Sequence, residues 1–150
     1  MTLLKKYPAR PREKGFTPPY EKLEQAAVTN LFLATGARVF NMSQYRASHV
    51  AVGISDLYVM HERRRVAWWF ECKRYHAIWT NGDETVCFDP FKRETWMPLT
   101  MSKAQQDFRA SCLACGVPHF WGGRREAEDA LVEVGLAQRG ANGLELVAIR

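Results

Sequence analysis

The sequence lacks any long apolar segment. Its 150 residues are 47% hydrophobic and 25% charged, yet no apolar run approaches the roughly 20 residues of a transmembrane helix. The basic N-terminus is not followed by an apolar core, so we expect neither a membrane span nor a secretory signal. Cysteine is also scarce, with four residues, which fits free thiols in a reducing compartment. No internal repeat is present, and the length predicts one domain. Because no secretory signal is expected, we expect this domain to be cytoplasmic.

Residues 1–19 form a basic segment without a core. They contain five basic residues, one acid and four prolines, a composition typical of a flexible arm. Their net charge of +4 supplies most of the formal +5, so the remaining chain is nearly neutral. Two interpretations stay open: an arm that lies along nucleic-acid phosphates, or a solvated tail.

Residues 53–73 predict a β-hairpin around which the rest is organised. Leu57–Met60 and Val66–Phe70 are apolar and aromatic, and a polar stretch separates them. If Glu62–Arg65 is a four-residue turn, the opposed residues share a sheet face. The expected pairs are His61 with Val66, Tyr58 with Trp69, Leu57 with Phe70, and Asp56 with Glu71.

This pairing places Asp56, Glu71 and Lys73 together at the open end of the hairpin, while Cys72 points to the other face. Neighbouring carboxylates repel unless a cation compensates, and Mg²⁺ prefers oxygen ligands. A lysine beside them orients an attacking water or stabilises charge on a phosphate. The simpler interpretation is a surface salt bridge. Because aromatic residues occupy both faces of 66–70, a covered central strand is expected, where charged residues are seldom incidental.

These residues resemble the VRR-NUC branch of the PD-(D/E)xK nuclease superfamily. That branch carries Gly-x-Pro-Asp, a hairpin with Glu-x-Lys, a Ser-x-x-Gln helix start and a Gly that ends the helix. The corresponding segments are Gly53–Asp56, Glu71–Lys73, Ser102–Gln105 and Gly116. The resemblance spans roughly Tyr20 to Trp121. Ser55 departs from it, because the family usually has a structural proline there.

The resemblance implies an α/β fold, a restriction-endonuclease-like mixed sheet flanked by helices. It implies a Mg²⁺- or Mn²⁺-dependent DNA endonuclease in which Asp56, Glu71 and the backbone carbonyl of Cys72 bind metal. Lys73 would then orient the water.

The resemblance also implies two supporting side chains. A glutamate on the first helix would face the metal site, and Glu24 fits best, with Glu21 in reserve. Gln105 would hydrogen-bond Lys73 or the water, although Gln106 is adjacent and a register error would exchange them.

Partners follow from the same resemblance. Stand-alone bacterial and phage members are often homodimers that cut branched DNA such as four-way junctions or flaps, as in DNA repair. Two alternatives remain: a non-catalytic DNA-binding module of the same fold, and a sequence-specific restriction-type nuclease.

Candidate DNA contacts surround the hairpin. Arg46 and His49 lie in the loop before Gly53, which is either a phosphate-contacting loop or plain surface, and Arg74 and Lys103 complete the set. Residues 74–100 are an insertion in which Asn81-Gly82 predicts a short hairpin. Its aromatic residues either engage DNA or a partner subunit, or pack on their own domain.

The other elements follow from periodicity and turn residues. Cys112 and Cys115 form a Cys-x-x-Cys pair for which zinc would need two more ligands. We predict helices at 20–35, 100–114 and 124–138, and strands at 37–42, 117–121 and 144–149.

Overall fold

The computed structural model describes residues 21–42, 53–73, 75–78, 84–86, 97–98 and 100–147. Its helices are α1 (Glu21–Ala34), α2 (Lys103–Ala114) and α3 (Arg124–Glu133). Its strands are β1 (Arg38–Asn41), β2 (Leu57–His61), β3 (Val66–Cys72), β4 (Tyr75–Ile78), β5 (Glu84–Val86), β6 (Met97–Pro98), β7 (His119–Gly122), β8 (Ala137–Gly140) and β9 (Gly143–Leu146). None of the helices within these ranges is long and apolar enough to cross a membrane.

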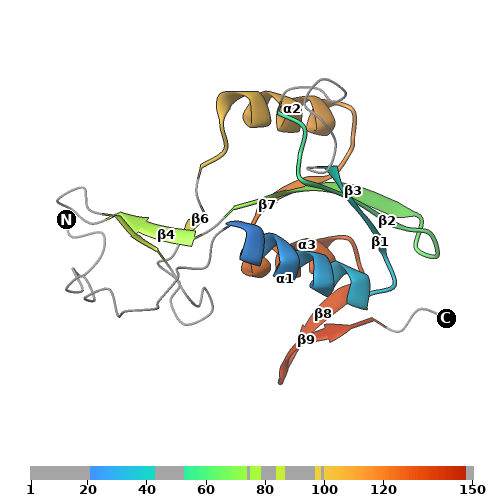
Figure 1. Ribbon diagram of the computed structural model, residues 1–150. Coiled ribbons are helices and arrows are strands. Elements are labelled where there is room, and N and C mark those ends of the chain that lie inside the picture. The colour runs from blue at the N-terminus through green and yellow to red at the C-terminus, as the bar shows by residue number, and fades with distance from the viewer. Residues whose placement is uncertain are drawn as a thin grey trace.

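A four-stranded mixed sheet in the order β1-β2-β3-β7 forms the centre of the fold. The first three strands are antiparallel, and β7 runs parallel to β3. Helices α1 and α3 lie on one side of this sheet and α2 on the other (Figure 1). The prediction of an α/β protein with a mixed sheet flanked by helices is therefore confirmed at this level.

The central hairpin has the predicted register. Tyr58 pairs with Trp69, Leu57 with Phe70 and His61 with Val66. The four-residue turn is tight enough to place Arg65 at a φ of 54°. Since side chains alternate along a strand, this register decides which residues of β3 face each helix layer.

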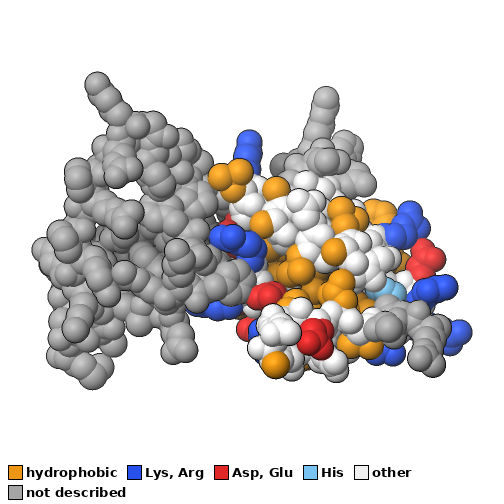
Figure 2. Space-filling model, turned by 90° about the horizontal axis from the view of Figure 1, so that it is seen from below, with side chains coloured by type: hydrophobic (Ala, Val, Ile, Leu, Met, Phe, Trp, Pro, Cys, Tyr) orange, Lys and Arg blue, Asp and Glu red, His pale blue; other side chains and the backbone are white. Residues whose placement is uncertain are grey.

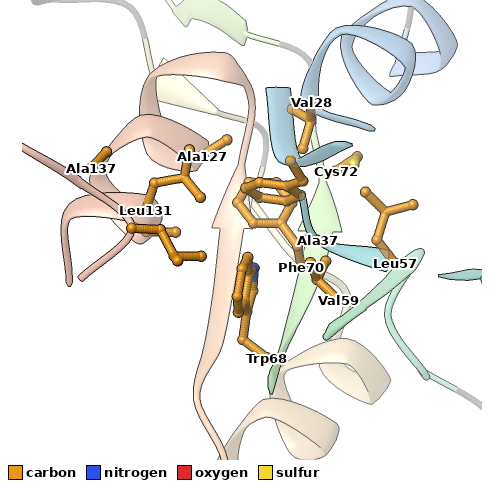
Figure 3. Close-up of a cluster of buried hydrophobic side chains, with 13 residues drawn as sticks. Val28, Ala37, Leu57, Val59, Trp68, Phe70, Cys72, Ala127, Leu131 and Ala137 are labelled. Carbon is orange, nitrogen blue, oxygen red and sulfur yellow. The ribbon is translucent and has the colours of Figure 1, made fainter. Parts of the chain in front are cut away.

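The main core lies between the sheet and the α1–α3 layer. Trp68 and Phe70 are fully buried there, and each ring meets Phe32 of α1 edge-on with centroids 5.3 Å apart. Cys72 points into the same core, beside Val28 (Figure 3). The opposite face of β3 meets α2, where Phe108 packs edge-on against Trp69 at 5.2 Å. β3 is therefore covered on both sides, as its hydrophobic sequence predicted.

The C-terminal part differs from the prediction. The expected helix over 124–138 ends at Glu133, because Gly135 adopts a φ of 82° and returns Leu136 and Ala137 to the core. Residues 137–140 instead form β8, which pairs with β9 across the predicted Asn142-Gly143 turn. The strand expected over 144–149 is Gly143–Leu146, and 148–150 lie outside the described residues.

The insertion contains the predicted hairpin and one further strand. β4 pairs with β5 on one side and with β6 on the other, in a three-stranded antiparallel sheet. Figure 1 shows this sheet at the side of the molecule, away from the β1-β2-β3-β7 sheet.

Candidate functional site

The turn that precedes β2 fixes Asp56 at the end of the hairpin. Gly53 has a φ of 83°, and a Cβ there would overlap the Ala104 carbonyl of α2. Only glycine permits this close approach of the turn to α2. The Met42 N–H donates to the Asp56 carbonyl at 2.7 Å, and the Cys72 N–H donates to Asp56 Oδ2 at 2.9 Å. Asp56 is thus bound to β1 through its backbone and to β3 through its carboxylate.

Glu71 on β3 and Lys73, which directly follows this strand, lie close together as predicted, and Glu71 contacts α2 through Gln105. Glu71 is 2% exposed, and the Lys73 ammonium lies 3.7 Å from its Oε1. Gln105 Nε2 donates to the same oxygen at 2.7 Å. The other carboxylate oxygen, Oε2, is buried and has no hydrogen-bond partner among the described protein atoms. One oxygen of Glu71 is therefore held by protein donors, whereas the other accepts no such hydrogen bond, and the carboxyl group lies beside Asp56.

The first turn of α2 decides which way the Gln105 amide points. Ser102 is the N-cap: its Oγ accepts from the Gln105 N–H, and its own N–H donates to Gln105 Oε1 at 2.9 Å. This capping box occupies the amide oxygen, so the amide nitrogen is the end that reaches Glu71. Gln105 was expected to hydrogen-bond Lys73 or the water, and its amide nitrogen donates to the Glu71 oxygen that lies beside the Lys73 ammonium. The neighbouring Gln106 instead donates to the Met101 carbonyl.

The surroundings of Glu71 disfavour the ionised form of its carboxyl group. Burial, with the adjacent Asp56 carboxylate, raises the pKa of Glu71 to about 8, against the lowering effect of Lys73. A buried carboxylate with an unpaired oxygen is unfavourable, so at neutral pH the free protein keeps a proton on Glu71.

The site fits a hard divalent cation. Among the described residues no three His, Cys, Asp or Glu side chains gather as metal ligands. Mg²⁺ does not need three, because it commonly binds through one or two carboxylates and keeps several waters. The Asp56–Glu71 pair, with the unpartnered Glu71 Oε2, meets that requirement, and the thiol of Cys72 is directed away into the core as predicted.

The carboxylate of Glu24 connects α1 to α3. It is buried and accepts from the Arg124 N–H at 2.7 Å and from Arg124 Nε at 3.0 Å. These bonds join α1 to the first residue of α3, where a negative charge stabilises the helix N-terminus. Its hydrogen bonds therefore run to Arg124, not to the Asp56–Glu71 pair. The side chain of Glu21 lies outside the described residues.

The predicted DNA contacts are only partly described. Arg46, His49 and Arg74 lie outside the described residues. Lys103 is exposed on the first turn of α2 and forms an ion pair with Asp107 at 3.2 Å. Lys and Arg side chains mix with Asp and Glu on the described part of the surface in Figure 2, without a broad patch of one sign.

A buried Ser55–His119 pair was not anticipated from the sequence. Ser55 Oγ and His119 Nε2 are 2.7 Å apart, and both residues are almost fully buried. Burial lowers the pKa of His119 to about 4, with Arg109 adding to the effect. The pair connects the turn before Asp56 to β7. Its signal in the sequence was Ser55 itself, the polar residue where the resembling family has proline.

The Cys-x-x-Cys pair does not belong to any group of three or more potential metal ligands among the described residues. Cys112 is buried, Cys115 is exposed, and both are free thiols. Burial raises the pKa of Cys112, and the neighbouring Cys115 adds to this. A raised pKa disfavours the thiolate that metal binding and redox chemistry require.

Comparison with known proteins adds no assignment. No family model matches the chain, and neither the curated proteins nor the solved structures yielded a match.

Proposed function

We propose that this protein is a Mg²⁺- or Mn²⁺-dependent nuclease that hydrolyses phosphodiester bonds in DNA. The observation that carries the proposal is the convergence of Asp56, Glu71 and Lys73, with Glu71 Oε2 buried and unpartnered. Two carboxylates and a lysine at one point suit a phosphate substrate held by a hard cation.

The order of elements supports the same proposal. A helix, a strand, the Gly53 turn, the Glu-x-Lys hairpin and the Ser102-capped helix follow one another as in the resembling VRR-NUC branch. Gly116, the glycine that ends the helix in the resembling motif, follows α2 with a φ of 73°. The restriction-endonuclease-like fold is part of this proposal.

Each side chain has a role in the proposed reaction. Asp56 and Glu71, with the carbonyl of Cys72, would hold the cation, which supplies Lewis-acid stabilisation of the phosphate and a more acidic water. Lys73 orients that water or stabilises the charge that develops on the phosphate. Gln105 holds Glu71 Oε1, so that Oε2 keeps its direction.

The preferred substrate is branched DNA, such as a four-way junction or a flap, and the active form is a homodimer. These two points rest on the resemblance. A two-fold dimer offers two sites for symmetric cutting.

The test is cleavage of labelled DNA with Mg²⁺ or Mn²⁺ by the wild type, Lys73→Ala and Arg38→Ala. The panel contains duplex, single strand, flap, splayed arm and four-way junction. Arg38→Ala is the matched control, because it also removes one positive charge but at the far end of the hairpin, where Arg38 is exposed. We expect Lys73→Ala to lower the rate by at least about 100-fold and Arg38→Ala to leave it unchanged.

The outcome separates the candidate functions. Preference for branched substrates supports a structure-selective nuclease, whereas cutting at one duplex sequence indicates a restriction-type enzyme. DNA binding without cutting under either metal would contradict the catalytic assignment and support the non-catalytic module.

A further inference from the structure

A cleft of about 580 Å³ lies between α1 and the ends of β1 and β2, and Asp56 forms part of its wall. The other lining side chains come mainly from one flank of α1, at helical spacing. They are Lys22, Gln25, Ala26, Thr29, Asn30 and, from β1, Asn41. The cleft is therefore adjacent to the proposed catalytic site and shares one of its residues, Asp56.

The lining is rich in neutral hydrogen-bonding groups. Three primary amides and one hydroxyl are present, while Lys22 and Asp56 contribute opposite charges. A groove for the phosphate backbone alone is typically lined by Lys and Arg. Amides present a donor beside an acceptor, which is the arrangement that pairs with the edge of a nucleobase. This chemistry favours a base over a phosphate as the occupant.

The size and position of the cleft restrict how a base can enter. Its volume lies within the roughly 300–1,000 Å³ of small-molecule sites, which is enough for one nucleotide. A base that is stacked and paired in a duplex cannot reach such a cleft without leaving the stack, which costs a few kcal/mol and least when the base is already unpaired. Since Asp56 borders the cleft, the base would belong to a nucleotide next to the scissile phosphate.

We propose that this cleft binds an unpaired nucleobase beside the cut, so that the substrate class is DNA with at least one unpaired nucleotide at the cleavage position. This inference rests on the proposed nuclease function and deepens it. Gln25 and Asn30 are the specificity-determining residues, because they are the amide residues that α1 contributes to the lining of the cleft.

The experiment compares the wild type with a Gln25→Ala/Asn30→Ala double variant. The substrates are a fully paired duplex and the same duplex with one unpaired nucleotide at the cut. We expect the wild type to prefer the unpaired substrate, and the double variant to raise KM on it about 10-fold, as for loss of a good amide–base pair, with kcat nearly unchanged. Alanine is a strong helix former, so α1 is retained.

Two controls make the result specific. Gln138→Ala removes an amide from exposed β8 and should leave KM unchanged. Fluorescence anisotropy with the Lys73→Ala background, without divalent metal, should show the same 10-fold weakening for a single-stranded oligonucleotide, independently of cutting.

The outcomes distinguish this inference from the proposed function. Equal cutting of the two substrates by the wild type, or an unchanged KM in the double variant, would overturn the cleft assignment while the nuclease stands. A lower kcat with unchanged KM would overturn it too. Absence of cutting on every substrate with either metal contradicts the nuclease itself.

Discussion

The metal-free protein should lose stability as the pH rises from about 6.5 to 8, because folding favours a proton on Glu71. The pKa of this carboxyl is raised from 4.5 to about 8 in the folded protein. A raised pKa contributes stability that is fully present below 4.5 and is lost as the pH rises through 8. At roughly 1.4 kcal/mol for each pH unit, the full difference corresponds to about 5 kcal/mol.

Glu71→Gln should remove this loss. Glutamine retains an oxygen that can accept from Gln105, and it places an NH₂ group where the second oxygen faces Asp56. It carries no charge that must be buried, so its stability at pH 8 should exceed that of the wild type by several kcal/mol. The assay is urea denaturation in EDTA at pH 5, 6, 7 and 8, with stability extrapolated to water.

Glu62→Gln is the matched control, since it makes the same chemical change at a side chain that is 70% exposed in the hairpin turn. It should follow the wild type at every pH. If Glu71→Gln showed the same pH dependence as the wild type, the proton on Glu71 would be refuted.

The affinity for divalent metal should rise with pH, in contrast to the stability of the metal-free protein. A cation binds the ionised carboxylate, so Mg²⁺ must displace the proton from Glu71 at neutral pH and its affinity should rise up to pH 8. Calorimetric titration with Mn²⁺ in two buffers of different ionisation enthalpy measures the proton released. Release that is identical in the wild type and Glu71→Gln would contradict the assignment of Glu71 as a ligand.

Three further predictions concern the surroundings of the site. Gln105→Ala removes both the capping box and the hydrogen bond to Glu71, so the free energy of unfolding should fall by about 1–3 kcal/mol and calorimetric titration should show a weaker affinity for Mn²⁺. Gln106→Ala, which removes the adjacent amide, should leave the metal affinity unchanged. An equal loss of metal affinity in both variants would contradict the role of Gln105. The pKa of His119 is lowered to about 4, so its contribution to stability is present above pH 6.5 and falls by about 3 kcal/mol as the pH drops to 4, against the gain from Glu71 over the same range. In the Glu71→Gln background, which removes that gain, His119→Gln should flatten the pH profile below 6.5. An unaltered slope there would count against the buried neutral imidazole. Gly53→Ala should lower the free energy of unfolding by more than about 3 kcal/mol and separate the turn from α2. Gly116→Ala is also at positive φ, but an added Cβ would meet open space, so it should lower the free energy of unfolding by only about 1–2 kcal/mol. Equal losses in urea denaturation would show that the contact with α2 is unimportant.

Local sequence determined the central hairpin and the position of its charged residues. Alternating apolar residues and a four-residue turn allowed the pairing of Leu57 with Phe70 to be predicted, and that register alone places Glu71 and Lys73 on one face and Cys72 on the other. Ser102–Gln105 is identified as a helix start through the resemblance, and the structure shows a capping box there, although the helix expected over 100–114 begins only at Lys103. Such features depend on distances along the chain, which the sequence contains directly.

Only the tertiary structure decided which groups meet across the sheet. Gln105 and Glu71 are 34 residues apart, and Glu24 and Arg124 are 100 apart. These contacts depend on how α2 packs against one face of β3 and how α1 meets α3 on the other. The sequence made Glu24 a candidate for the metal site, and its hydrogen bonds to Arg124, which depend on the docking of α3, could not be read from it. The same packing buried Glu71, and burial rather than residue type raised its pKa.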